Sequence, residues 1–110
     1  MIVGKWVTCT ITSGTTTTEC DLGREYETVL VQLPSLTSGT VAVQGSKYSG
    51  DTAKDIYTYV PTTGAVIQMI TAATTGNYLC VFPIGGFRFI KFVCGASQTS
   101  KTFYCCGVRS

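Results

Sequence analysis

The segment Trp6-Val7-Thr8-Cys9-Thr10-Ile11-Thr12 shows the pattern that decides the fold. Apolar side chains fall at every second position, and threonines separate them. Successive side chains of a β-strand point to opposite faces, so Val7, Cys9 and Ile11 share one face, and Trp6 shares the other with the threonines. The first face is apolar enough to join a core, and the second is polar enough to meet water. The segment therefore predicts an amphipathic β-strand.

Short apolar runs of this kind recur along the whole chain at intervals of about ten residues, and Gly, Pro, Ser, Asn or Asp closes each one. No helical period of apolar residues competes with this pattern. The spacing is typical of an all-β fold, and we expect an antiparallel β-sandwich, jelly-roll-like, of about eight or nine strands. The strands are predicted near residues 5–13, 17–23, 27–33, 39–46, 54–60, 64–71, 77–82, 87–94 and 101–109.

Alternation inside these runs also predicts the core. Val29, Val31 and Leu33 share one face of their run, and Val41 and Val43 share one face of the next. We expect these inward sets to meet between two sheets. The run 87–94 (FRFIKFVC) is apolar on both faces apart from its two cations, so it predicts a central strand or an outer face that meets a partner.

Length and charge restrict the classes of protein. The 110 residues suit one domain, 1–110. Only 13% of the residues are charged, against a usual share of about 25%, while 45% are hydrophobic, which excludes disorder. The net charge of +2 comes from scattered residues, so we expect no nucleic-acid binding.

The chain shows no targeting signal. No stretch approaches the roughly 18 apolar residues of a membrane span, and the first residues lack the basic segment and long apolar run of a signal peptide. We therefore expect a protein that is made in the cytoplasm and binds no membrane.

An enzymatic role has little support. The chain has no histidine, which removes the commonest general base and the commonest zinc ligand. Asp51 and Asp55 lie four positions apart without the motif of a calcium loop or of a glycosidase pair. We expect no enzyme, no catalytic residue and no cofactor.

The six cysteines allow two interpretations. Their even number in a short chain is typical of a secreted disulfide scaffold, but the missing signal peptide argues against that. No Cys-x-x-Cys pair is present, and the vicinal Cys105 and Cys106 would point to opposite faces of a strand, so we expect no metal site. Most of the six are predicted to be small core residues, with at least one disulfide as the alternative. They are Cys9, Cys20, Cys80, Cys94, Cys105 and Cys106.

Two groups of residues are candidates for binding. Phe87, Arg88, Phe89 and Lys91 combine arginine with aromatic rings, a composition that concentrates binding energy at protein interfaces. The alternative is that both cations only reach water from a central strand. Tyr48, Tyr57 and Tyr59 flank a polar loop and could stack on sugars, although aromatic side chains of a sandwich are mostly core and interface material.

Several short segments resemble small structural proteins encoded in tailed-phage genomes. These segments are 10–17 (TITSGTTT), 21–23 (DLG), 33–44 (LPSLTSGTVAVQ), 55–57 (DIY) and 85–92 (GGFRFIKF). Cys80, Cys94, Cys105 and Cys106 stand where this family would have Thr, Val or Ser. Residues 88–91 (RFIK) are also similar to a strand of discoidin-like sugar-binding domains.

The resemblance implies a virion β-sandwich, either a head decoration (cement) protein or a related head or fibre module. The low share of charged residues and the strands that are apolar on both faces agree with this resemblance, because exposed apolar surface usually contacts a partner protein. We expect a protein that binds the major capsid protein on the capsid surface, as a homo-oligomer or as multiple copies around symmetry axes. The alternatives are a sugar-binding module on a virion fibre and, third, a secreted disulfide-rich domain.

Overall fold

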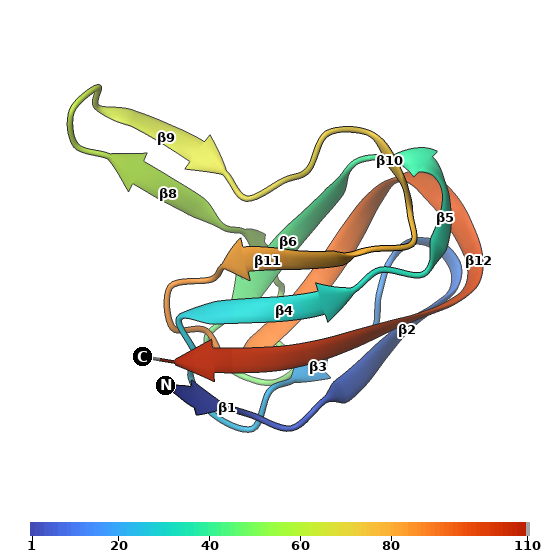
Figure 1. The fold of residues 1–110 in the computed structure, drawn as a ribbon, viewed down its shortest axis with the longest axis horizontal. Coiled ribbons are helices and arrows are strands. Elements are labelled where there is room, and N and C mark those ends of the chain that lie inside the picture. The colour runs from blue at the N-terminus through green and yellow to red at the C-terminus, as the bar shows by residue number, and fades with distance from the viewer. Residues whose placement is uncertain (110) are drawn as a thin grey trace.

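The computed structural model describes residues 1–109 and is all-β (Figure 1). The described residues contain no helix that is long and apolar enough to cross a membrane. The strands are β1 (Ile2–Val3), β2 (Val7–Thr16), β3 (Cys20–Asp21), β4 (Thr28–Gln32), β5 (Ser35–Gly39), β6 (Val41–Ser46), β7 (Lys54–Asp55), β8 (Tyr57–Val60), β9 (Ala65–Gln68), β10 (Thr74–Gly76), β11 (Leu79–Pro83) and β12 (Phe89–Arg109).

One curled antiparallel sheet contains eight of these strands. Its path runs β11-β4-β12-β6-β7, and β1, β2 and β3 also pair with β12. The first residues of β12 pair with β3 and β6, and its last residues pair with β4 and β1. The sheet therefore folds over on itself through β12, which confirms the predicted antiparallel sandwich. The pairing of β1 with the end of β12 also places Ile2 opposite Arg109, so the first and last strands lie side by side (Figure 1).

The predicted strands 87–94 and 101–109 are one continuous strand of 21 residues. The residues between them stay in the sheet because Gln98 and Thr99 pair with Gly14 and Ser13 of β2. This part of β12 is also tied to β5 by the buried Gln98 amide. Its Nε2 donates to the carbonyl oxygen of Thr37 at 3.1 Å, and its Oε1 accepts from the Thr37 N–H at 2.9 Å. A register shift between Val93 and Gln98 provides the bend.

The curl of β12 brings two of its own aromatic rings together. Phe92 and Phe103 stack with their centroids 5.5 Å apart, and both side chains are fully buried. The predicted inward residues of the other strands surround them, which confirms that part of the core; these residues are Cys9, Ile11, Val29, Val31, Leu33, Val41 and Val43. On β12 itself, Ile90, Phe92 and Cys94 face inward.

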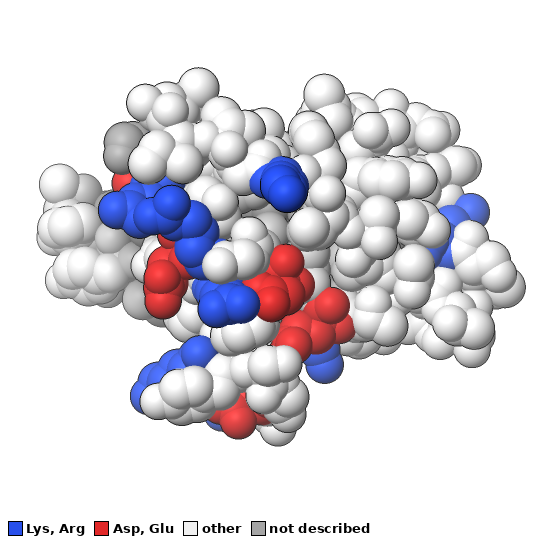
Figure 2. All heavy atoms as spheres, turned by 90° about the horizontal axis from the view of Figure 1, so that it is seen from below, with Lys and Arg blue, Asp and Glu red and all other residues white. Residues whose placement is uncertain are grey.

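A long part of the chain carries no charged side chain. The sequence holds no charged residue between Asp55 and Arg88, a stretch that includes the two-stranded β8–β9 sheet and β11. The β8–β9 hairpin projects from the rest of the chain (Figure 1). On the face shown in Figure 2, charged side chains gather over one part and leave a broad area with few charges.

Close packing of Tyr26 requires a glycine in β12. A Cβ on Gly107 would lie 2.1 Å from Cδ2 of Tyr26, whose ring is buried. We therefore expect Gly107→Ala to destabilise the protein by about 1–3 kcal/mol, measured by denaturant unfolding.

The Tyr26→Ala background provides the control, because it removes the ring that the new methyl group would strike. In that background Gly107→Ala should cost little further stability. Equal costs of Gly107→Ala in both backgrounds would contradict this explanation.

Candidate functional site

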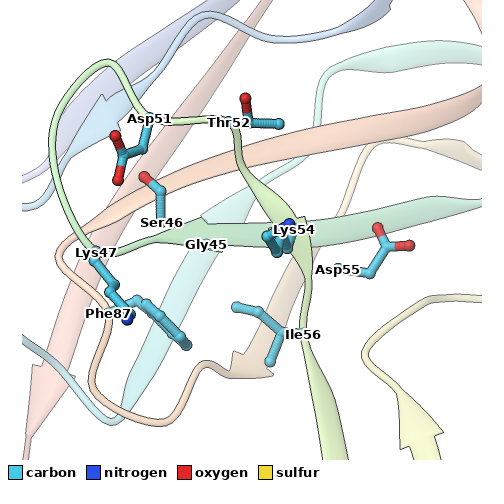
Figure 3. A pocket seen from close by; sticks show the side chains of 9 residues that line it. All are labelled: Gly45, Ser46, Lys47, Asp51, Thr52, Lys54, Asp55, Ile56 and Phe87. Carbon is cyan, nitrogen blue, oxygen red and sulfur yellow. The ribbon is translucent and has the colours of Figure 1, made fainter.

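The candidate site surrounds Phe87, just before β12. A hollow of about 350 Å³ lies here, between the end of β6, the following loop and β7 (Figure 3). Lysine and aspartate side chains line its rim, and Phe87 and Ile56 supply apolar surface. The lining residues are Gly45, Ser46, Lys47, Asp51, Thr52, Lys54, Asp55, Ile56 and Phe87.

Gly45 makes room for the apolar part of this hollow. A Cβ at position 45 would lie 2.8 Å from Cγ of Phe87 and 3.2 Å from Cδ1 of Ile56. In Figure 3 the side chains of Phe87 and Ile56 point toward one another across this position. The absence of a side chain on Gly45 therefore lets the ring of Phe87 lie against β6.

A second hollow of about 530 Å³ shares Ser46, Lys47 and Phe87 with the first. Its lining joins residues from both groups that the sequence singled out: Tyr48 lies with Phe87, Arg88 and Phe89. The complete lining is Glu25, Ser46, Lys47, Tyr48, Gly86, Phe87, Arg88 and Phe89.

The other candidate residues lie on neighbouring strands. Lys91 is half-buried in β12, and its partner across the sheet is Gln44 of β6. Tyr57 and Tyr59 are exposed on β8, and they share one face because they are two positions apart. The predicted tyrosine group is therefore divided between the hollow, which holds Tyr48, and the projecting hairpin.

Arg88 is held by two contacts. Its Nε donates to Oδ1 of Asp21 at 2.8 Å, and its Nη2 donates to Oδ2 at 3.1 Å. The guanidinium carbon also lies 5.0 Å from the centroid of the Phe89 ring, which favours a cation–π contact. The bidentate pair holds the guanidinium beside the hollow, and the Arg88 and Asp21 side chains stay 42% and 47% exposed.

The Glu19 carboxylate, just before β3, anchors the loop after β6 that borders the first hollow. Glu19 accepts from the Ser49 hydroxyl at 2.7 Å and from the Gly50 N–H at 3.0 Å. The loop after β6 is therefore tied to the segment before β3. This contact keeps the rim of the site in place.

Three cysteines converge elsewhere, inside the core. The sulfur atoms of Cys9, Cys20 and Cys105 all lie within 4.8 Å of one another, and the Cys9 and Cys105 sulfurs are 3.8 Å apart. Hydrogen bonds from Cys105 and Cys20 lower the Cys9 pKa, whereas contacts with Cys20 and Cys9, together with burial, raise the Cys105 pKa. All six cysteines are free thiols in this structure.

Sequence reasoning predicted the two strands of the β8–β9 hairpin within 54–60 and 64–71 but not that the hairpin projects, and it missed the thiol group. The feature of the sequence that could have indicated this exposed hairpin is the absence of charged residues from 56 to 87. The thiol group had no signal, because strand pairing brings together cysteines as distant as Cys9 and Cys105.

Comparison with known proteins identifies a shared fold but no family. No protein-family model and no curated protein matches the chain. The structure is similar to the SPBc2 prophage-derived protein YomS, with a TM-score of 0.58 and 16% sequence identity over 97% of this chain and 95% of that chain. The two chains thus share a fold over almost their whole lengths.

A weaker similarity links the structure to the Tobacco streak virus coat protein dimer. The TM-score is 0.34 and the identity 12%, over 96% of this chain and 86% of that chain. These values are too low to establish a shared fold.

The Asp21–Arg88 pair gives a testable pH dependence. The hydrogen bonds from Arg88, with a further one from the Gly23 N–H, lower the pKa of the Asp21 carboxyl. This pair should therefore stabilise the fold fully above the unfolded carboxyl pKa of about 3.9, and its contribution should be lost as pH falls through the lower folded value. In Arg88→Ala the Asp21 pKa, followed by NMR titration, should rise toward its ordinary value.

Arg88→Lys is the matched control. It keeps the positive charge but loses the two parallel hydrogen bonds, so it should restore only part of the shift. An unchanged Asp21 pKa in Arg88→Ala would contradict the assignment.

Proposed function

We propose that this chain is a structural protein of a phage particle, a head decoration (cement) protein that binds the major capsid protein at the capsid surface. The observation that carries the proposal is the exposed, uncharged apolar surface. The fold shared with a prophage-derived protein supports a phage origin. The role is assembly and stabilisation, without catalysis.

The β8–β9 hairpin is the clearest part of that surface. Tyr57, Tyr59, Val66 and Ile67 are each more than half exposed. A two-stranded hairpin is marginally stable by itself in water, and a cluster of exposed apolar side chains usually marks a contact with another protein. A capsid lattice offers such a contact in many copies, and repetition strengthens a modest interface.

In addition to this uncharged surface, we propose that the residues around Phe87, which include the cations Arg88 and Lys91, form a second face that docks on the capsid. Phe89 and Lys91 lie on the opposite face of β12 from the buried Ile90 and Phe92. Asp21 already holds Arg88 against the Phe89 ring in the free chain. A fixed side chain loses little conformational freedom on binding, so this face is preorganised for a partner.

Tyr57 and Tyr59 favour a second candidate, a sugar-binding module on a virion fibre. Their rings are exposed on one face of β8, where they could stack on a sugar. Under this alternative, Tyr57→Ala or Tyr59→Ala would abolish binding to a glycan array, and Tyr48→Ala would test the hollow in the same way. A flat array with the unmodified protein would exclude it.

The cement proposal predicts a measurable contribution to the head. Mass spectrometry should find the chain in purified virions at a copy number comparable to that of the major capsid protein. Heads without it should release DNA at a lower temperature or under milder osmotic shock, because contacts that span capsid subunits must break before the lattice opens. Equal robustness of undecorated heads would refute the cement role.

Single substitutions on β12 test the docking face. Phe89→Ser should leave a folded protein that no longer co-sediments with heads, since the Phe89 side chain lies outside the core. Ile90→Ser, one residue away but fully buried, should instead destabilise the fold by about 3 kcal/mol or more. Tyr104→Ser, exposed farther along β12, should fold and still bind. Normal binding by Phe89→Ser would refute the docking assignment.

We also propose that copies of the chain pair through β11, the edge strand of the main sheet. Backbone bonds from Leu33 to Tyr78 and from Ile84 to Glu27 flank its ladder with β4. Because hydrogen-bonded positions alternate in an antiparallel pair, the N–H and C=O groups of Leu79 and Val81 point away from β4. They can bond to the same strand of a second copy.

The chemistry of β11 suits a second copy. Leu79 and Val81 expose 68% and 58% of their surface, and the absence of charge from 56 to 87 means that no like charges would oppose each other. Edge strands that avoid pairing usually carry charges or bulges.

One register uses the outward N–H and C=O groups of both Leu79 and Val81. With Leu79 opposite Val81 of the second copy, both residues form two bonds each and Cys80 faces its own copy. Pairing Val81 with Val81 would instead set Leu79 against Pro83, which has no N–H to donate.

This register predicts a specific cross-link. Facing Cys80 residues would have Cα atoms about 4.5 Å apart, within the range of a disulfide. Mild oxidation with diamide, which accepts the two thiol hydrogens, should give a covalent dimer. Cys80→Ala should abolish this dimer, and Cys94→Ala, which removes a buried thiol, should not. A chain that stays monomeric at all concentrations and does not cross-link would refute the pairing.

A further inference from the structure

Three thiols meet in the core, and their arrangement differs from that of the other cysteines. Cys9 lies in β2, Cys20 in β3 and Cys105 in β12, with exposed fractions of only 0–1%. Their sulfur atoms all lie within 4.8 Å of one another. Cysteines used only as small apolar residues need not direct their sulfurs toward a common point.

We propose that Cys9, Cys20 and Cys105 bind one thiophilic metal ion of the zinc or copper(I) class. Thiolates are the ligands that these soft ions prefer. With metal–sulfur bonds of about 2.3 Å, three sulfurs in a plane around an ion lie about 4 Å apart. The Cys9 and Cys105 sulfurs are already 3.8 Å apart, so binding requires only small side-chain movements.

The surroundings of the thiols suit a bound ion. The buried hydroxyl of Thr17 accepts from the Phe92 N–H at 3.0 Å, and it contributes to the lowered pKa of Cys9. A polar group beside a ligand atom typically orients that atom and strengthens a metal site. Among the described residues, no fourth cysteine, aspartate or glutamate joins the group.

Charge distinguishes the two kinds of ion. Binding replaces three thiol protons, which pass to the solvent, so the affinity should rise with pH. A divalent ion with three thiolates leaves a buried charge of −1, whereas a monovalent ion leaves −2. Because buried charge is costly, the divalent ion is favoured on charge. Copper(I) is favoured on coordination number, since structural zinc usually takes four ligands.

The test is metal analysis of the whole chain refolded under reductant with zinc(II) in one arm and copper(I) in the other. Elemental analysis after gel filtration should find one ion per chain in at least one arm. Cadmium(II) should give a thiolate charge-transfer absorption and should protect all three thiols from alkylation. The metal-loaded chain should also melt at a higher temperature than the metal-free chain.

Variants locate the ion. Cys20→Ala should lose the stoichiometric ion, and Cys94→Ala, equally buried but outside the group, should keep it. If Cys20→Ala does not fold, Cys9→Val provides the second test, and circular dichroism verifies folding in each case. A folded, reduced wild-type chain that binds neither ion would overturn the proposal. Retention of the ion by folded Cys20→Ala, or a native Cys9–Cys105 disulfide, would also overturn it.

Discussion

The stacking of Phe92 on Phe103 is the contact around which the rest of the structure is arranged. Both rings belong to β12, so the strand must bend between them for their centroids to lie 5.5 Å apart. The bend turns one sheet into two facing layers and gives the inward valines of β4 and β6 a common core. The buried Gln98 amide ties the bent part of β12 to β5, because it hydrogen-bonds to the backbone N–H and C=O of Thr37. Burial of the amide is tolerated because it is fully hydrogen-bonded.

Local patterns in the sequence were sufficient to predict most of the longer strands and the inward faces of β2, β4 and β6, but not the short strands β1, β5 and β10. Val7 to Ile11 and Val29 to Leu33 alternate clearly, because burial on one side of a sheet imposes a period of two. The continuity of β12 was not predictable, since residues 95–100 are polar and resemble a loop. They remain in the sheet because Gln98 and Thr99 pair with Gly14 and Ser13 of β2, a long-range contact that no local pattern encodes.

The candidate site was predicted only in part. The sequence identified Phe87, Arg88 and Phe89 by their composition, but the contact with Asp21 depends on the pairing of β3 with β12. Tyr48 lies beside them only because the chain turns after β6. The thiol group depends on three strands that are distant in sequence, and cysteine spacing is informative only where ligands lie close together along the chain.

The central place of β12 has a consequence for how the protein is made. Five strands of the main sheet, β1, β2, β3, β4 and β6, pair with it directly, so none of those pairings can form before the ribosome reaches β12. The pairings with β1 and β4 also need its last residues. Until then five strands lack their partner, and the uncharged stretch 56–87 has no electrostatic repulsion to keep neighbouring chains apart. Folding dominated by such distant contacts is slow and open to aggregation. We therefore expect the nascent chain to need chaperones. The yield of folded protein should depend on how rapidly β12 is translated.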